Sequence, residues 1–191
     1  KEQQRIAIMK AESLQKLGQT NKAKQLLVPF LKENNDDIYL AYANLEEDNE
    51  AKLKWINKIF EKHNEIKIEL QDNKSTTYDS LYPVGSYEKV KNKYKVSIIV
   101  PVYNAGRMID TAIRSLINQS WENIEVIIVD DCSTDDTYTI AKEYETIDSR
   151  VKVIKTKQNG GAYTARNTAL QYVTGDFITI NDADDWSHPK K

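Results

Sequence analysis

Short apolar runs alternate with longer segments of helical periodicity between residues 95 and 185. This alternation constrains the fold more than any other feature, because strand–helix–strand units of this kind build a parallel β-sheet. We expect four strands, at residues 96–102, 124–129, 151–154 and 177–180. The unbroken Val/Ile run of the first is typical of a strand that helices cover on both faces. The expected fold class is therefore α/β with a mostly parallel sheet.

Helices are expected in the gaps between these strands. An apolar stripe at helical spacing follows the first strand and is formed by Ile109, Ala112, Ile113, Leu116 and Ile117. A second helical pattern covers residues 162–173, with Ala165 and Ala169 on one face. Gly175 and Asp176 then predict a helix stop and a turn before the last strand.

Each expected strand delivers polar residues to its carboxyl end. Ligands bind beyond that edge in an open parallel sheet, so these residues are the candidates for a site. They lie in residues 101–104, 130–137, 158–161 and 181–186. Together they supply an aromatic ring at Tyr103, several carboxylates and a pair of glycines. This combination fits a nucleoside diphosphate with a metal ion.

Three carboxylates, those of Asp182, Asp184 and Asp185, crowd the end of the last strand. Like charges so close together repel, and a bound cation would neutralise them. Oxygen-only ligands suit a hard ion such as Mg²⁺ or Mn²⁺. A solvated turn is the alternative interpretation, because Asp is a favoured turn and cap residue.

The other candidate residues have structural alternatives as well. Tyr103 suits a strand end that packs on its neighbours. Residues 131–137 make a good helix N-cap, since Ser, Thr and Asp oxygens accept the free N–H groups of a first turn. Gly160 and Gly161 suit either a turn of positive φ or a close approach of backbone N–H groups to phosphate oxygens. Arg166 is either a surface residue or a cation for a diphosphate.

These motifs, taken together, resemble family 2 glycosyltransferases, which have the Rossmann-like GT-A fold. The resemblance covers residues 95–191 and rests on VSIIVPVYN (96–104), SLINQS (115–120), VIIVDDCSTDDT (126–137), NGG with ARN (159–161, 165–167) and GD leading to DADD (175–176, 182–185). It implies an inverting transferase, hexosyl or related and of class EC 2.4, that takes a sugar from a UDP-sugar with the help of a divalent metal ion, Mn²⁺ or Mg²⁺. The acceptor implied is a glycan.

The resemblance implies roles for residues around the nucleotide base. Pro101, Val102, Tyr103 and Asn104 match the wall of the family's base pocket, with Tyr103 stacked on uracil. Asp131 matches the carboxylate that binds the uracil edge.

Further roles are implied around the diphosphate. Gly160 belongs to the nucleotide-binding glycine loop, and Arg166 matches an arginine that approaches the diphosphate. Asp182 and Asp184 are the ends of the DxD motif, with Ala183 between them. Asp184 is implied as the main metal ligand, while Asp182 lies nearer the ribose and is a second candidate ligand.

The chain departs from the family at its end. It stops at Lys191, shortly after the acidic motif, whereas the acceptor-binding half and the catalytic base of the family normally follow. We therefore expect an incomplete GT-A sheet, a base beyond Lys191, and a chain that binds donor but is inactive alone. Bacterial surface-polysaccharide or cell-wall glycan synthesis is the expected setting.

Residues 1–64 have a different, helical composition, rich in Lys, Glu, Gln, Leu and Ala. About four helices in two hairpins are expected, and Ala23 and Ala51 each follow a turn. The pair resembles degenerate tetratricopeptide-type hairpins, which bind protein partners or pack on a neighbouring domain. A small bundle that supports the α/β domain is the alternative.

Residues 65–94 are expected to be an interdomain linker, with loops at residues 73–77, Pro83 and Gly85. Its aromatic residues indicate that it packs against a domain, because a disordered linker carries few of them. These residues are Tyr78, Tyr82 and Tyr87. The expected domains are therefore residues 1–64 and 95–191, joined by this linker.

Overall composition gives little support to several classes of function. The formal net charge of −2 gives no case for nucleic acid or a strongly anionic membrane as partner. A single cysteine, Cys132, excludes an internal disulfide. No apolar stretch approaches the roughly 20 residues that span a bilayer. We expect a cytoplasmic protein, peripheral at most at the inner face of the membrane.

Two other functions stay open from sequence. A sugar-nucleotide-forming nucleotidyltransferase shares the broad fold, but it would carry a Gly-rich loop with Arg and Lys where this chain has residues 101–104. The second is a helical protein-interaction module attached to a catalytically incomplete nucleotide-binding domain.

Overall fold

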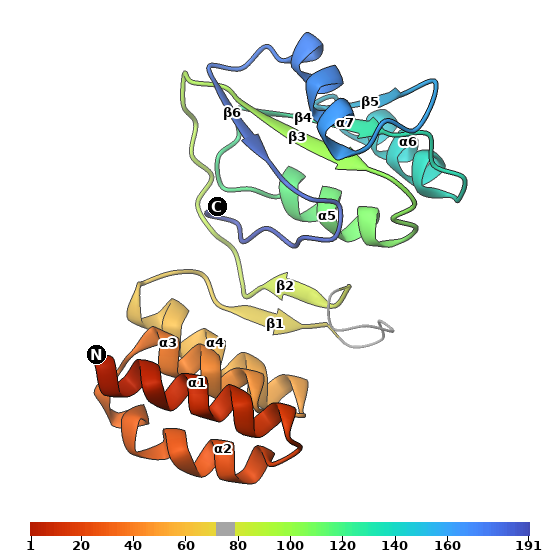
Figure 1. Cartoon of the computed structure of the whole chain (residues 1–191). Helices are drawn as coiled ribbons and strands as arrows, with labels where there is room; N and C mark the ends of the chain where they lie inside the picture. The colour runs from red at the N-terminus through yellow and green to blue at the C-terminus, as the bar shows by residue number, and fades with distance from the viewer. Residues whose placement is uncertain (72–78) are drawn as a thin grey trace. The chain divides into compact units, whose positions relative to one another are not determined.

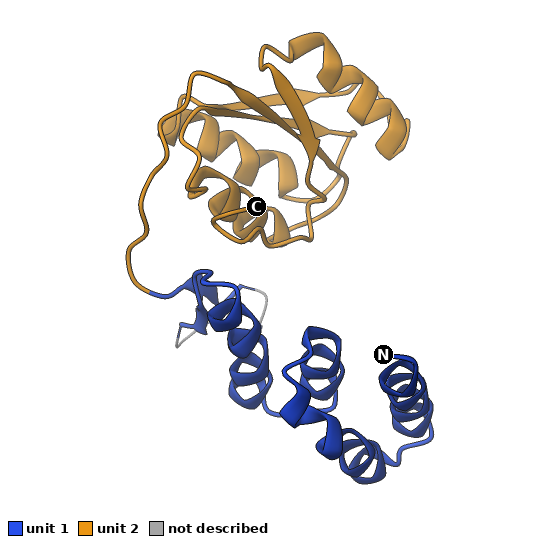
Figure 2. Cartoon of the chain, turned by 90° about the vertical axis from the view of Figure 1, so that its left-hand side faces the viewer, with its two compact units in different colours: residues 1–84 blue, residues 85–191 orange. Residues whose placement is uncertain are grey.

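The computed structural model describes residues 1–71 and 79–191 (Figure 1). The loop expected at residues 73–77 and Tyr78 lie outside the described residues. The chain divides into two compact units, Lys1–Val84 and Gly85–Lys191, which Figure 2 distinguishes by colour. Each unit has an apolar core of its own.

The second unit is built on a four-stranded sheet in which all neighbouring strands run parallel (Figure 1). Its strands are β3 (Val96–Val102), β4 (Ile124–Asp130), β5 (Val151–Lys155) and β6 (Phe177–Ile180). The four expected strands and the α/β class are confirmed. β4 and β5 are each one residue longer than expected, because Asp130 stays in register opposite Val102 and Lys155.

Helices cover both faces of this sheet. They are α5 (Met108–Ile117), α6 (Thr137–Ile147), α7 (Ala162–Ala169) and the short 3-10 helix η2 (Leu170–Tyr172). α5 and α6 lie on one face, where Ile113 and Ala141 pack into a core with Val100 of β3. α7 covers the other face, where Ala165 packs with Ile99 of β3. The expected helix at residues 162–173 is therefore α-helical only as far as Ala169.

The strand order β5-β4-β3-β6 reverses beside β3. The chain passes from β3 to β4 to β5 in one direction, then returns through α7 and adds β6 on the free side of β3. In open α/β sheets, ligands bind at the carboxyl ends of the strands where the order reverses. The carboxyl ends of β3 and β6 therefore mark the position at which a site is expected.

The first unit begins with four α-helices and a short 3-10 helix. They are α1 (Glu2–Lys16), α2 (Thr20–Leu27), η1 (Val28–Glu33), α3 (Asp36–Asn44) and α4 (Asn49–Lys62). α1 packs on α2 around small and aliphatic side chains such as Ala11, Ala23 and Leu27. α3 packs on α4, where the Trp55 ring contacts the ring of Tyr42 at 4.8 Å. The sequence sets the helix starts, since the side chains of Asn35 and Asp48 accept hydrogen bonds from first-turn N–H groups.

Residues 65–94, expected to be one linker, are divided between the two units. β1 (Ile68–Leu70) and β2 (Leu81–Pro83) pair antiparallel and belong to the first unit. Asn57 of α4 holds β1, because its Nδ2 donates to Ile68 O at 2.7 Å and its Oδ1 accepts from Ile68 N at 2.8 Å. Residues 85–94 belong to the second unit, where Val90 N donates to Ser120 O at 2.7 Å. In the described ranges, no helix combines the length and apolarity needed to cross a bilayer.

Candidate functional site

A buried carboxylate organises the glycine loop at the carboxyl ends of the strands. Asp131 directly follows β4 and is only 2% exposed. Its carboxylate accepts the N–H groups of Gly160 at 2.9 Å and Gly161 at 2.6 Å, and the hydroxyl of Thr156 at 3.0 Å. The structure thus brings together two predicted site residues, Asp131 and Gly160. The glycine N–H groups point at Asp131, however, and not into open space where a phosphate would lie.

The glycine loop requires its glycines for two separate reasons. Gly161 has φ +83°, a conformation that other residues rarely adopt. At Gly160 a Cβ atom would lie 2.7 Å from the Cγ2 atom of Thr164. Thr164 in turn donates its hydroxyl to Gly160 O at 2.7 Å, which ties the loop to the first turn of α7.

The loop after β3 is held against the loop after β4. Asn104 has a left-handed backbone, with φ +48°, and its N–H donates to Ser133 Oγ at 2.9 Å. Its Oδ1 accepts from Thr134 N at 2.8 Å. Tyr103 lies beside this junction with 51% of its surface exposed, so its ring is available for stacking. Pro101 and Val102, expected in the wall of the base pocket, are buried in β3.

Residues at and just before the start of α6 also hold the loop after β3 against the loop after β4. Gly106 N donates to Asp135 Oδ2 at 3.0 Å and to Thr137 Oγ1 at 2.9 Å. Burial acts to raise the pKa of Asp135, but hydrogen bonds from Thr137 and Gly106 outweigh it and hold this pKa below its ordinary value. Asp135 is therefore a fixed anion of the loop scaffold.

An ion pair crosses from α7 to the acidic loop after β6. Arg166 Nη2 lies 2.9 Å from Asp182 Oδ1, and the guanidinium stacks on the ring of Tyr163 at 5.5 Å from its centroid. Arg166 Nε is buried and has no hydrogen-bond partner among the described residues. The pair joins two residues that the sequence placed in one site, although they are 16 positions apart in the chain.

Asn181 is 1% exposed and fixes the acidic loop, residues 181–186, through hydrogen bonds. Asn181 Nδ2 donates to Asp182 O at 2.9 Å, and Asn181 Oδ1 accepts from Ser187 Oγ at 2.6 Å. Asp185 N donates to Asp182 O at 3.1 Å and closes a tight turn. Ala183 packs against the α5 side of the core, so the carboxylate of Asp184 faces solvent.

The carboxylates of the acidic loop are the candidate ligands for a metal ion. Within residues 1–71 and 79–191, no group of three or more His, Cys, Asp or Glu side chains stands ready to hold an ion. Asp182 is engaged by Arg166, and no described residue donates a hydrogen bond to the exposed carboxylate of Asp184. Mg²⁺ is commonly bound by one or two carboxylates together with substrate phosphates. The residues present fit such a shared site and not a site made of protein ligands alone.

Four buried or half-buried polar residues that build this edge were given no individual role from sequence. They are Asp130, Thr156, Asn181 and Ser187. Asp130 and Asn181 lie within the segments predicted for the site, whereas Thr156 and Ser187 lie outside them. Asp130 is completely buried, with Oδ2 3.6 Å from Lys155 Nζ and Oδ1 without a partner among the described residues. A buried role for Asp130 could have been predicted from its position, because it ends an apolar strand and directly precedes Asp131.

The parallel sheet with its polar, partly acidic crevice is an open α/β domain whose polar loops follow the carboxyl ends of the strands. Residues 97–191 match the family model for glycosyl transferase family 2. The matched segment begins in β3 and contains the whole of the crevice described above.

Curated glycosyltransferases are similar to about half of this chain. TuaG of Bacillus subtilis, a glycosyltransferase assigned to teichuronic acid biosynthesis, is 45% identical over 96 residues, which are 50% of this chain and 38% of TuaG. Glycosyltransferase GlyA of Streptococcus pneumoniae is 40% identical over 92 residues, which are 48% of this chain and 13% of GlyA. The chain therefore spans well under half the length of these relatives. The crystal structure of S. aureus TarS 1-349 in complex with UDP-GlcNAc aligns with 38% identity and a TM-score of 0.47, over 50% of this chain and 28% of that one.

Proposed function

We propose that this chain carries the donor-binding part of a glycosyltransferase that moves a sugar from a UDP-sugar to a glycan acceptor. A divalent metal ion assists, and the transfer serves synthesis of a surface polysaccharide or cell-wall glycan. The match to the family 2 model supports the reaction class, and the similarity to the teichuronic acid glycosyltransferase supports the glycan setting. The proposed location is the cytoplasm, at the inner face of the membrane.

The observation that carries this proposal is that Asp131, Arg166 and Asp182 all lie at the same edge of the sheet. Asp131 follows β4, Arg166 lies in α7 and Asp182 follows β6, and each has a hydrogen-bond partner in another segment of the crevice. The site thus combines a carboxylate for a base edge with a cation for phosphate and an acidic pair for a metal.

Base recognition falls to Tyr103 and Asp131 in this proposal. The exposed ring of Tyr103 stacks on uracil, and the Asp131 carboxylate accepts the uracil N3–H. Asp131 accepts four hydrogen-bond contacts, one from Thr156, two from the N–H of Gly160 and one from Gly161, and a carboxylate offers about four lone-pair positions. The uracil N3–H would therefore replace one of the two contacts over which the Gly160 N–H is shared. Asn104 holds the loop that carries the Tyr103 ring.

The diphosphate falls to Arg166 and the acidic loop. Arg166 donates to phosphate oxygens through the partly exposed guanidinium that pairs with Asp182. Asp184 and Asp182 are the proposed metal ligands, and a bound divalent ion would stabilise negative charge on the leaving diphosphate. We assign the catalytic base to no residue of this chain.

The first unit is proposed to bind a protein partner as a pair of tetratricopeptide-like hairpins. The helix pairs α1/α2 and α3/α4 support this proposal, as does their core of small residues. α1 also exposes apolar side chains, with Ile6 at 45% and Met9 at 58%, and Leu17 directly after the helix is 71% exposed. Deletion of residues 1–64 should remove partner capture and leave UDP binding intact.

Calorimetric titration with UDP tests the donor site. We expect binding in Mn²⁺ that weakens at least tenfold after chelation, and the same loss in Asp184→Asn with the metal present. Glu12→Gln removes a similar charge from exposed α1 and should bind like the parent chain. Equal binding of UDP by the parent chain and Asp184→Asn in Mn²⁺ would contradict the metal assignment, and no binding of UDP in any condition would contradict the donor assignment.

A further inference from the structure

The net charge of the chain conceals a strongly basic segment. Four of the seven residues 89–95 are lysine, and none of the seven is acidic. Two of these lysines serve the fold, because Lys89 Nζ donates to Gln119 O at 2.9 Å and Lys95 Nζ pairs with Glu125 at 2.6 Å. Lys91 and Lys93 are exposed, and neither forms an ion pair with any described residue.

Exposed apolar side chains lie beside these two lysines. Tyr94 is 44% exposed and its ring meets that of Phe177, which is 57% exposed, at 5.7 Å in an edge-to-face contact. Val90 is 41% exposed and forms a β-bridge with Trp121, whose indole N–H donates to Tyr94 O at 3.1 Å. We call Val90, Lys91, Lys93, Tyr94 and Phe177 the basic–aromatic patch.

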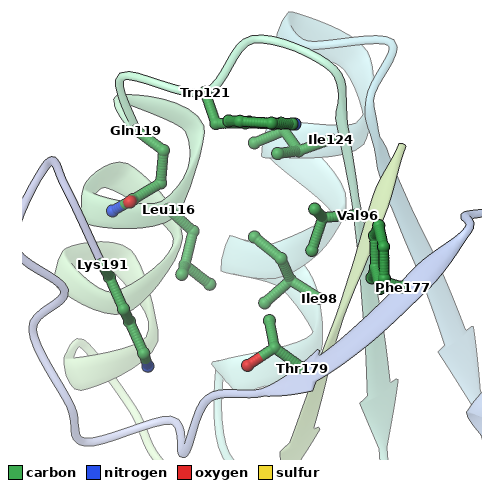
Figure 3. Close-up of a pocket in the computed structure, with 9 residues that line it drawn as sticks. All are labelled: Val96, Ile98, Leu116, Gln119, Trp121, Ile124, Phe177, Thr179 and Lys191. Atoms are coloured by element: carbon green, nitrogen blue, oxygen red, sulfur yellow. The ribbon is translucent and has the colours of Figure 1, made fainter. Parts of the chain in front are cut away.

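An apolar cavity of about 230 Å³ opens next to the basic–aromatic patch (Figure 3). Phe177 belongs both to the cavity wall and to the patch, and Trp121 belongs to the cavity wall and pairs with Val90 of the patch. The rest of the wall is aliphatic at Val96, Ile98, Leu116 and Ile124 and polar at Gln119, Thr179 and Lys191 (Figure 3). The cavity is smaller than the ~300–1,000 Å³ of pockets that enclose a drug-sized ligand, so it suits the end of an aliphatic chain.

We infer that the basic–aromatic patch binds the surface of an anionic phospholipid membrane. Lysines near such a surface are attracted to lipid phosphates, and aromatic rings prefer the boundary between head groups and acyl chains. Lys91 and Lys93 supply the first interaction, and Tyr94 and Phe177 supply the second. The adjacent cavity accepts the end of an acyl chain. A soluble polyanion would use the lysines but would leave the exposed rings and the cavity without a role.

The position of the patch separates it from the candidate donor site. Lys93 and Tyr94 precede β3, and Phe177 is the first residue of β6, so the patch lies at the amino ends of these parallel strands. Asp131, Arg166 and Asp182 lie at or beyond the carboxyl ends. A membrane bound at the patch therefore leaves the donor crevice accessible, and the inference does not depend on which nucleotide the crevice takes.

Vesicle co-sedimentation of the whole chain tests this inference. We expect binding to equimolar phosphatidylglycerol/phosphatidylcholine vesicles and little binding to phosphatidylcholine alone. Lys91→Gln with Lys93→Gln should weaken binding about 30-fold, from about 1 kcal/mol for each lysine near the surface. Phe177→Ser should weaken it without loss of the folded circular-dichroism signal, because the ring is mostly exposed.

The control is Lys10→Gln with Lys16→Gln, which removes the same charge from exposed positions of α1. This variant should bind vesicles like the parent chain. Unchanged vesicle binding by the Lys91/Lys93 variant would overturn the inference. Binding of soluble dextran sulfate as tightly as of anionic vesicles, with no effect of Phe177→Ser on either, would identify a general polyanion surface and would also overturn it.

Discussion

Arg166 and Asp182 form an ion pair at 2.9 Å between α7 and the loop that follows β6. The pair is the direct link between the phosphate side and the metal side of the proposed donor site. Its side chains keep 26% and 55% of their surface exposed, so solvent screens their attraction. Exposed pairs of this kind contribute about 0–1 kcal/mol to stability. Binding, and not folding, is the reason we expect this pair to matter.

Arg166→Gln should therefore weaken UDP binding far more than it destabilises the chain. A charge-assisted hydrogen bond to phosphate is worth about 1.5–3 kcal/mol, which is roughly a 10- to 150-fold change in Kd. Calorimetry with UDP and urea unfolding of the same variant check the two effects. Arg107→Gln, at an exposed position, is the matched control. A large loss of stability with unchanged UDP affinity would assign Arg166 to the fold.

Asp131→Asn should destabilise the chain by about 2 kcal/mol or more, because the amide no longer offers a charged acceptor to the N–H groups of Gly160 and Gly161. Thr156→Val should cost about 1 kcal/mol. Since the Thr156 hydroxyl donates to Asp131, the double variant should cost less than the two single changes added together. Urea unfolding of the three variants measures this coupling.

Thr146→Val serves as the control for the hydroxyl, because Thr146 is exposed on α6 and donates its hydroxyl only to the neighbouring Glu143 O. It should change stability by less than about 0.5 kcal/mol. Strict additivity of Asp131→Asn and Thr156→Val would show that the glycine loop does not depend on their contact.

Strands could be predicted from sequence because buried parallel strands demand unbroken Val/Ile runs, and β3 has such a run. The three-residue strand β1 was missed, since Ile68–Leu70 is too short to show a period and depends on the side chain of Asn57. The partners of Asp131 could not be predicted either. They are backbone N–H groups 29 and 30 residues away, and only the folded chain decides where these point.

Glu125, near the start of β4, binds residues at the start of β3 and residues that precede β6. These contacts lie at the amino ends of the strands, away from the candidate site. The Glu125 carboxylate accepts from Ser97 Oγ at 2.5 Å, from Thr174 N at 2.6 Å and from Lys95 Nζ at 2.6 Å. Burial acts to raise the pKa of Glu125, but these donors, led by Lys95, outweigh it and lower the pKa from 4.5 to about 2. Glu125 is therefore charged in the folded state at any pH above that value.

This lowered pKa predicts a specific acid sensitivity. A carboxyl whose folded pKa is depressed stabilises the fold above its unfolded pKa, and this stabilisation is lost as the pH falls from about 4.5 to about 2. The shift corresponds to about 3 kcal/mol. Glu125→Gln should therefore be less stable than the parent chain at pH 6, and the difference should shrink towards pH 2 in urea unfolding. Glu143→Gln, at an exposed position on α6, should show no such convergence. A difference that is constant with pH would contradict the prediction.

Metal binding should require the nucleotide. No described group of three or more metal-binding side chains stands ready at the acidic loop, where Asp182 is already engaged by Arg166. Mn²⁺ alone should therefore leave the melting temperature unchanged, whereas Mn²⁺ with UDP should raise it above the value with UDP alone, because a ligand stabilises the state it binds. Differential scanning fluorimetry of the parent chain and Asp184→Asn measures both effects, and the variant should lose the gain from Mn²⁺. If Mn²⁺ raises the melting temperature equally without UDP, the ion binds to protein ligands alone and the shared phosphate–carboxylate site is wrong.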